Sequence, residues 1–299
     1  GAIKQTAPLD CERDSLNQKK HMPLSSEHNG DAFPFVMTEG YDATKTIYID
    51  PSLTFSTFSG AISDNWGFTA TPDIYGNLFG GGIVMGSQYP VTTGAYDVTY
   101  QGGQGTIATD IGITKFNAQG TTLLYSTFIG GSGNETPHSL VCAENGELFI
   151  YGVTGSTDFP MSGASFDNIF GGGPSVTENS INFLGADIYI ARLSPSGANL
   201  LASTYLGGTD NDGLNLDNLH MNYGDQFRGE IMLDENNNVY VASTTYSSDF
   251  PLSNPQQATL NGLQDAVLFK MPPGLNSLSW STYFGGVGLE SGNSIQVND

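Results

Sequence analysis

The sequence is poor in positive charge. Its 299 residues contain 9 Lys and Arg against 30 Asp and Glu, which gives a formal net charge of −21 at pH 7. Such a chain repels phosphate groups and anionic lipid headgroups. It also lacks any run of about 18 consecutive apolar residues, the length that a membrane-spanning helix needs. We therefore expect no nucleic-acid partner and no direct insertion into a membrane.

Cysteine is nearly absent as well. The two cysteines, Cys11 and Cys142, exclude a disulfide framework and a CxxC metal cluster. Cys142 ends an apolar run, so the sequence predicts a buried free thiol there. A bridge between Cys142 and Cys11 is the alternative, and it requires the N-terminal segment to fold back. Only 13% of the residues are charged and 39 are glycine, which favours a packed β protein over a disordered acidic chain.

No stretch shows a helical period over three turns, and internal repeats take its place. A first anchor occurs as STFSG at 56–60, STFIGG at 126–131, STYLGG at 203–208 and STYFGG at 281–286. A second anchor occurs as SQYP at 87–90, STDFP at 156–160 and SSDFP at 247–251. Four short runs with β-type alternation, separated by Asn, Asp and Gly turns, fill each repeat.

Four strands per repeat are typical of a β-propeller blade. The predicted fold class is therefore all-β: a propeller of four-stranded blades, with about three complete blades plus partial ones, preceded by an irregular N-terminal segment. The predicted complete units span about 61–131, 132–208 and 209–286, with partial units at 46–60 and 287–299. Residues 1–45 show no repeat and are interpreted as a linker or as the end of an upstream domain.

Three segments carry a resemblance to a known family. YSTFIGG, NGELFIYGVTGSTDFP and DIYIARLSPSGANLLASTYLGG resemble the seven-bladed β-propeller repeat of large secreted bacterial surface proteins, many of them exported by the type IX route. The resemblance covers roughly residues 46–299. It implies an extracellular or cell-surface location and supplies no catalytic residues. The phase of the repeats predicts that the chain is part of a longer polypeptide, and a ring completed by other chains is the alternative.

Signatures of catalysis are missing from the sequence. There is no HExxH zinc motif and no GxSxG nucleophile elbow, and no pair of carboxylates stands out for glycoside cleavage. His138 and His220 occupy corresponding regions of successive units, so they are either isolated histidines or a metal pair in a central channel. We predict that the protein is not an enzyme.

One acidic loop is a candidate calcium site. Asp210, Asp212 and Asp217 lie in an expanded insertion at 209–226, where a hard cation would find several oxygen ligands. Another acidic loop begins at Asp234, but it lacks the later Gly and Glu of a calcium loop, so it is interpreted as an ordinary turn. Calcium is the only cofactor that the sequence suggests.

Aromatic residues in two insertions are candidate ligand-binding residues. Phe166, Phe170 and Phe183 lie in 161–186, and Tyr223 lies in 209–226. Rings on propeller loops beside Asp and Asn could stack on sugars, which makes a polysaccharide a candidate ligand. The alternative is that these rings pack beneath their own loops.

The sequence thus predicts a non-catalytic, secreted or surface-attached propeller that acts as a structural or interaction module of a larger adhesin-like protein. One alternative is a carbohydrate-active enzyme or carbohydrate-binding module on the same scaffold. Another is a subunit of a multi-chain surface assembly. The expected partners are the rest of a longer polypeptide or other surface-protein subunits. Fold alone does not decide among these functions.

Overall fold

In its described residues the computed structural model is built from β-strands with very little 3₁₀ helix, and its chain divides into two compact units, Gly1–Thr57 and Phe58–Asp299. The described residues are 9–13, 19–22, 24–26, 35–37, 47–50, 55–57, 59–215, 219 and 224–297. The all-β class predicted from the repeats is confirmed.

The described residues of the N-terminal unit form five short strands, which corrects the expectation of an irregular segment. They are β1 (Leu9–Arg13), β2 (Lys19–Met22), β3 (Leu24–Ser26), β4 (Phe35–Met37) and β5 (Ile47–Asp50). β1 pairs with β2 and with β5, and β3 pairs with β4, all antiparallel. Polar segments such as LDCER and KKHM hide this pairing from a search for apolar alternation. Because β5 pairs with β1, residues 47–50 belong to this unit, although the repeat pattern had grouped 46–60 with the blades.

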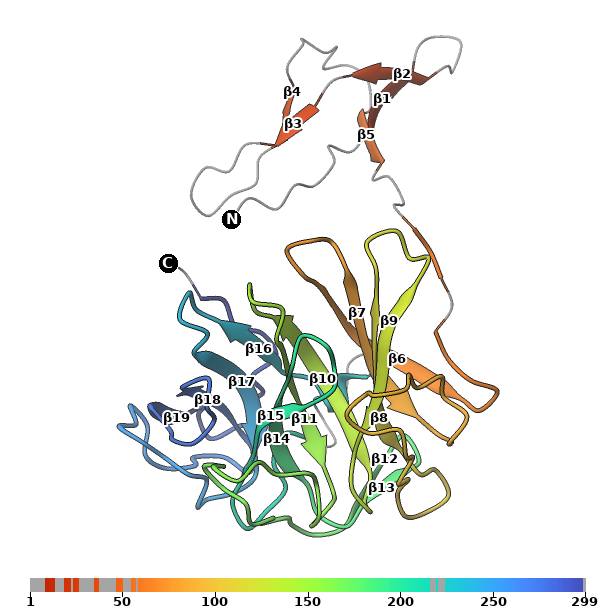
Figure 1. The fold of residues 1–299 in the computed structure, drawn as a ribbon. Coiled ribbons are helices and arrows are strands. Elements are labelled where there is room, and N and C mark those ends of the chain that lie inside the picture. The colour runs from red at the N-terminus through yellow and green to blue at the C-terminus, as the bar shows by residue number, and fades with distance from the viewer. Residues whose placement is uncertain are drawn as a thin grey trace. The chain divides into compact units, whose positions relative to one another are not determined.

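The second unit contains three four-stranded antiparallel sheets, and each sheet orders its strands as they follow in the chain (Figure 1). The first sheet contains β6 (Asn65–Pro72), β7 (Leu78–Val84), β8 (Asp110–Phe116) and β9 (Leu123–Ile129). The middle sheet contains β10 (Glu135–Cys142), β11 (Leu148–Thr154), β14 (Asp187–Leu193) and β15 (Leu200–Leu206). The C-terminal sheet contains β16 (Glu230–Leu233), β17 (Val239–Thr245), β18 (Asp265–Met271) and β19 (Trp280–Phe284). A hairpin of β12 (Val176–Glu178) and β13 (Ile181–Phe183) lies within the insertion at 161–186, and η2 (Asp225–Phe227) precedes β16.

Tight turns join the first two strands of each sheet. Asp73 and Asp234 each begin such a turn, and their Oδ1 atoms accept hydrogen bonds from backbone N–H groups further along it. The fourth position of the turn has a positive φ, which Gly76 (80°) and Asn237 (60°) supply. The loop at Asp234 is therefore the structural turn that its equivalents predicted.

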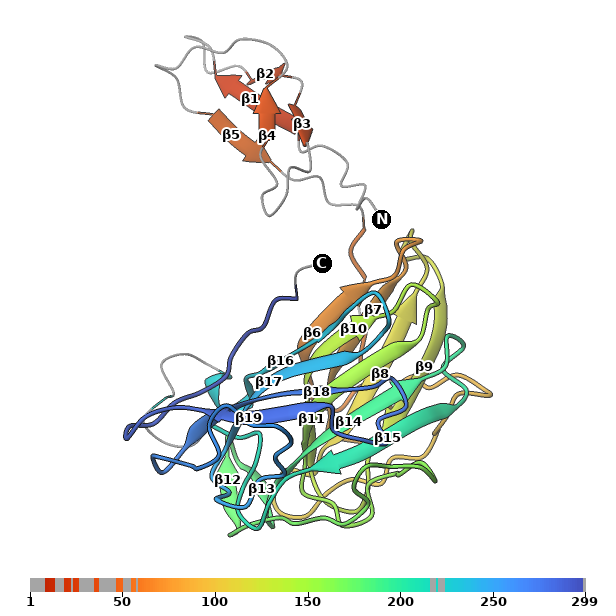
Figure 2. The same cartoon turned by 90° about the vertical axis from the view of Figure 1, so that its left-hand side faces the viewer.

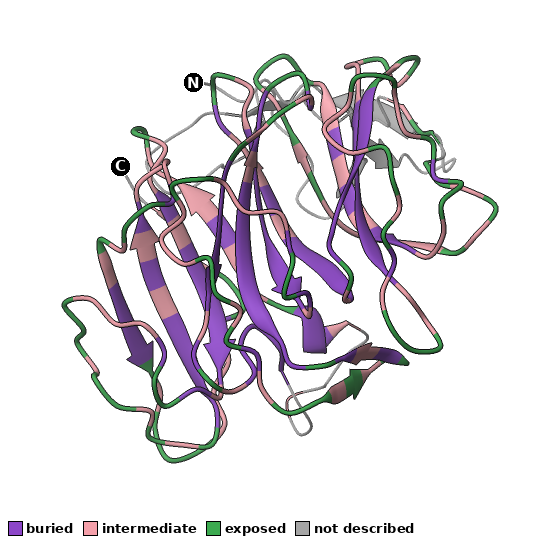
Figure 3. Ribbon diagram, turned by 60° about the horizontal axis from the view of Figure 1, so that its bottom comes forward, coloured by how far each residue is buried: buried purple, intermediate pink, exposed green. Residues whose placement is uncertain are grey.

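The apolar core lies between the sheets (Figure 3). Alternation along β14 sends Tyr189, Ala191 and Leu193 toward the first sheet, and it sends Ile188 and Ile190 toward the C-terminal sheet. All five side chains are completely buried. The middle sheet is therefore covered on both faces by a sheet of its own kind.

The outer face of the C-terminal sheet is different. Leu268 and Trp280 are half-buried there, and Phe284 is 63% exposed. The strand registers make these residues the equivalents of Ile190, Ala202 and Leu206, which are buried in the middle sheet and paired in the same positions.

The first strands of the three sheets lie next to one another (Figure 2). β10 packs against β6 on one side and against β16 on the other. These edge strands, together with η2, enclose the candidate functional site.

Candidate functional site

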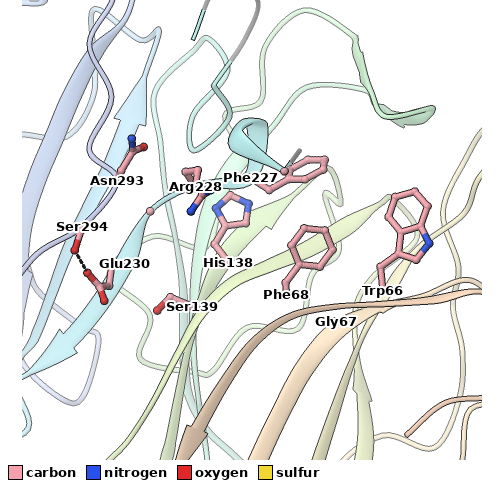
Figure 4. Close-up of a pocket in the computed structure, with 12 residues that line it drawn as sticks. Trp66, Gly67, Phe68, His138, Ser139, Phe227, Arg228, Glu230, Asn293 and Ser294 are labelled. Atoms are coloured by element: carbon pink, nitrogen blue, oxygen red, sulfur yellow. Dashed lines mark hydrogen bonds between the residues drawn. The ribbon is translucent and has the colours of Figure 1, made fainter. Parts of the chain in front are cut away.

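A pocket of about 490 Å³ opens between β6, β10 and β16 (Figure 4). Its walls come from all three sheets and from the segment after β19. The labelled lining residues are Trp66, Gly67, Phe68, His138, Ser139, Phe227, Arg228, Glu230, Asn293 and Ser294.

Aromatic rings form one wall of the pocket. The rings of Phe68 and Phe227 meet edge to face, with centroids 5.7 Å apart. The ring of Phe227 also lies 6.0 Å from the imidazole of His138. Trp66 and Phe68 are only partly buried, and both residues line the pocket. Such a wall can hold a flat apolar group by stacking.

His138 stands at the back of this pocket in a neutral state. Its side chain is buried, and its ring packs edge to face on Tyr151 with centroids 5.3 Å apart. Nε2 lies 3.2 Å from the hydroxyl of Thr136, and the backbone of Arg228 also acts on the imidazole, while the buried Nδ1 has no partner at hydrogen-bond distance among the described residues. Burial lowers the pKa of His138 to about 3, so the imidazole carries no charge near pH 7. It can offer a hydrogen bond to a ligand, but it cannot supply a positive charge. His220, its predicted companion, lies outside the described residues.

Polar groups form the opposite wall. The Arg228 side chain is 49% exposed and forms a salt bridge of 3.0 Å with Asp225. Glu230 Oε2 accepts hydrogen bonds from the Ser294 hydroxyl and, at 2.8 Å, from the backbone N–H of Ile295. The guanidinium and the exposed side chains of Asn293 and Ser294 remain as donors and acceptors at the mouth. The pocket therefore suits a polar ligand that has one apolar face.

Of the three predicted calcium ligands, the structure describes Asp210 and Asp212. Asp212 is fully buried; it accepts hydrogen bonds from the Thr245 hydroxyl, from the Gly208 backbone N–H at 2.8 Å and from the Ser247 hydroxyl at 2.9 Å. Asp210 is half-buried. Asp217 lies outside the described residues, and the described ones contain no group of three or more His, Cys, Asp or Glu that could hold a metal ion. Calcium binding stays a prediction. The hydrogen bonds of Asp212 connect the segment after β15 to the end of β17.

The candidate sugar-binding rings have packing partners. Phe183 is completely buried, so the expectation of an exposed ring is wrong for this residue. Phe166 is half-buried against the core between the middle and C-terminal sheets, and its backbone N–H donates to the carbonyl of Leu275 at 2.8 Å. Phe170 is half-buried with its ring 5.8 Å from that of Tyr205. Tyr223 lies outside the described residues.

Sequence reasoning missed a set of acidic side chains at the junctions between sheets. Each sheet's third strand begins with an Asp, and a second acid follows the paired glycines of the next anchor. The pairs are Asp110 with Glu135, Asp187 with Asp212, and Asp265 with Glu290. The signal was present in the sequence, because the second acid always lies five residues after the first glycine of the pair: Gly130, Gly207 or Gly285.

Comparisons with known proteins do not assign the chain to a group. No protein-family model matches it, and no curated protein matches it. Among the residues that the structure describes, no helix is both long and apolar enough to cross a membrane. Function is therefore argued from the geometry of the described residues.

Proposed function

We propose that the three sheets are blades of a β-propeller, and that the protein is a non-catalytic structural or interaction module of a secreted or cell-surface protein. The observation that carries this proposal is the repeated stacking of four-stranded sheets. Apolar side chains fill both junctions, and alternating side chains of β14, the third strand of the middle sheet, are directed to both neighbours. Propellers stack blades in this way, with the first strands nearest the axis.

A backbone hydrogen bond from a loop of one repeat to the next sheet also supports the proposal. In the first repeat, the Tyr96 backbone N–H donates to the carbonyl of Gly197 in the middle sheet, at 2.8 Å. In the second repeat, Phe166 makes the same contact with Leu275 in the C-terminal sheet. In the third repeat this position is Gln256, which is exposed. The C-terminal sheet therefore offers both a half-exposed apolar face and a loop donor to a further sheet, from a longer polypeptide or from another subunit.

An experimental structure of the protein, as isolated from the cells that produce it, tests this proposal. We expect a closed ring in which a further four-stranded sheet covers Leu268, Trp280 and Phe284. A native particle heavier than 31.7 kDa that contains only this chain would assign the covering sheet to another copy. A closed two-layer sandwich, or an outer face that stays in solvent, would overturn the propeller.

The pocket favours carbohydrate binding as a second candidate function. Partly buried Trp66 and Phe68 offer ring surfaces, and Arg228 and Asn293 offer hydrogen bonds, a combination that suits the apolar face and the hydroxyls of a sugar. The chain has two tryptophans, so the fluorescence of Trp66 can be isolated in Trp280→Phe. A screen of oligosaccharides should find one that changes this fluorescence. Trp66→Ala should abolish its binding in calorimetry, whereas Trp280→Ala should not. Equal binding by both alanine variants would remove the pocket as the site.

A further inference from the structure

The junction between the first and middle sheets contains two buried carboxyl groups that meet at one glycine. Asp110 begins β8 and Glu135 begins β10, and both side chains are completely buried. A Cβ atom on Gly130 would lie 2.6 Å from Asp110 Oδ1 and 2.8 Å from Glu135 Oε2. Both oxygens therefore point into the small space that the missing side chain leaves.

The remaining oxygens of the pair are occupied by donors. Asp110 Oδ2 accepts hydrogen bonds from the backbone N–H groups of Gln101 at 2.6 Å and Gly102 at 3.2 Å. Glu135 Oε1 accepts from the hydroxyls of Thr154, at 2.7 Å, and Ser156. Glu135 Oε2 accepts only a long bond of 3.3 Å from the Gly131 N–H, and Asp110 Oδ1 has no partner at all in the described residues.

Positive side chains do not balance this pair. The described Lys and Arg side chains, Lys115, Arg192, Arg228 and Lys270, form their salt bridges with other acids. The titratable groups that act on the pair are instead acids and tyrosines. They are Asp97 and Tyr100 near Asp110, and Asp158, Tyr189 and Tyr205 around Glu135 and the following glycines. Two carboxylates in such a dry place repel each other unless something positive lies between them.

We propose that Glu135 and Asp110 share one proton, which Glu135 Oε2 carries and directs to Asp110 Oδ1, so that this junction is a proton-binding site between two sheets. The proton supplies the partner that Asp110 Oδ1 otherwise lacks. It comes from solvent on folding and returns to solvent on unfolding, with no other bond made or broken. Gly130 is required because any side chain there would separate the two oxygens.

The same arrangement recurs at the junction between the middle and C-terminal sheets and at the end of the C-terminal sheet, so it is a regular feature of the repeat. A Cβ on Gly207 would lie 2.7 Å from Asp187 Oδ1 and 2.7 Å from Asp212 Oδ2. A Cβ on Gly285 would lie 2.7 Å from Asp265 Oδ1 and 2.8 Å from Glu290 Oε2. The argument for proton sharing rests on the first junction, where an oxygen has no partner.

The electrostatics agree with this geometry. Burial raises the pKa of Glu135 to about 8, against an ordinary value of 4.5, and burial raises the pKa of Asp110 to about 6. The folded state therefore holds a proton that the unfolded state releases above its ordinary pKa. Stability from this site is complete below about pH 4.5 and is lost as the pH rises toward 8. Each pH unit in that interval lowers the folding equilibrium constant by up to about tenfold.

Thermal unfolding of the full chain between pH 5 and 9 tests the proposal, with Glu135→Gln as the variant. Gln keeps the acceptor for Thr154 and Ser156 and offers an N–H to Asp110 Oδ1 without needing a proton. We expect the wild-type Tm to fall with rising pH, and we expect Glu135→Gln to flatten that slope. Exposed Glu144 provides the matched control, and Glu144→Gln should keep the wild-type slope. Equal slopes in the two variants would overturn the proposal.

A second readout does not depend on stability. Infrared spectra at pH 7 should contain the carbonyl band of a protonated carboxylic acid, and Glu135→Gln should lose part of it. If Glu135→Gln fails to fold, Gly130→Ala provides the second variant: the band should shift as the oxygens separate. Gly163→Ala, at a position with open space, should leave it unchanged. If no band is found, or if calcium raises the wild-type Tm and a chelator lowers it, a cation and not a proton would hold the pair.

Discussion

The middle and C-terminal sheets share one strand order and one register but differ in what covers them. Ile190 of β14 and Leu268 of β18 occupy the same place opposite Thr204 and Thr282. Ile190 is completely buried, whereas Leu268 is half-buried. The difference shows that the repeat specifies an apolar face whether or not a neighbour covers it in the described part of the chain.

The largest expected effect comes from truncating these two equivalent residues. Ile190→Ala should cost about 2–5 kcal/mol of unfolding free energy, because it leaves a cavity between two sheets. In the 299-residue chain by itself, without a further sheet over this face, Leu268→Ala should cost about 1 kcal/mol, because a half-exposed side chain gains only part of the transfer free energy. Urea unfolding of both variants measures the two costs. Equal costs would mean that something covers Leu268 in solution, which would remove the difference between the two faces.

The next comparison is between two cationic side chains, Arg192 of β14 in the middle sheet and Lys270 of β18 in the C-terminal sheet. Arg192 Nη2 lies 2.6 Å from Glu147, and Nη1 donates across the junction to the Pro273 carbonyl at 2.9 Å. Lys270 pairs with Asp234 at 3.2 Å, within its own sheet. Arg192→Ala should therefore cost about 1.5–3 kcal/mol.

Lys270→Ala serves as the control for Arg192→Ala, and it should cost about 1 kcal/mol or less. Both values come from urea unfolding at low and high salt, and the Lys270 value should shrink more as salt rises. If Lys270→Ala lowers the unfolding free energy as much as Arg192→Ala does, the hydrogen bond from Arg192 to the Pro273 carbonyl does not explain the expected difference.

A hydroxyl pair links the same two sheets. The Tyr151 hydroxyl lies 2.6 Å from Ser243 Oγ, and both side chains are completely buried. Tyr151→Phe should cost about 1–3 kcal/mol, because it leaves Ser243 without a partner in a dry site. Adding Ser243→Ala should recover most of that loss, as a double-mutant cycle in urea would show. Additive losses in the cycle would mean that the two hydroxyls act independently.

The repeats made the sheets predictable, because alternation and Asn, Asp and Gly turns are local features. Two of the segments quoted from the repeats, NGELFIYGVTGSTDFP and DIYIARLSPSGANLLASTYLGG, contain β11 and β14. The burial of Phe183 agrees with the alternative that these rings pack instead of binding a ligand. Its packing partner was not predictable, because β13 joins an apolar cluster that includes Phe227, more than forty positions further along the chain. Contacts between distant segments depend on how the sheets stack, which no single run encodes.

The site itself was only partly predictable. His138 was singled out as a residue that enters a first strand, and it does line the pocket between first strands. Asp212 was interpreted as a cation ligand because its loop is rich in acids. Its burial and its bonds to Thr245 and Ser247 follow instead from its place five residues after Gly207, a spacing that Glu135 shares. Position within the repeat therefore accounts for the contacts of Asp212, and calcium binding by its loop stays a prediction.

The smallest expected effect concerns the turn acid of the C-terminal sheet. Burial raises the pKa of Asp234, but hydrogen bonds from Asn238 and Lys270 outweigh it and lower the pKa to about 2. The unfolded chain titrates near the ordinary value of 3.8, so the contribution of Asp234 is present above that pH and is lost as the pH falls toward 2. Asp234→Asn should therefore flatten the fall of Tm between about pH 4 and pH 2. Glu235→Gln, at the exposed neighbour, should not flatten it. If both variants behave alike, the acid sensitivity of this sheet arises from net charge and not from the Asp234 turn.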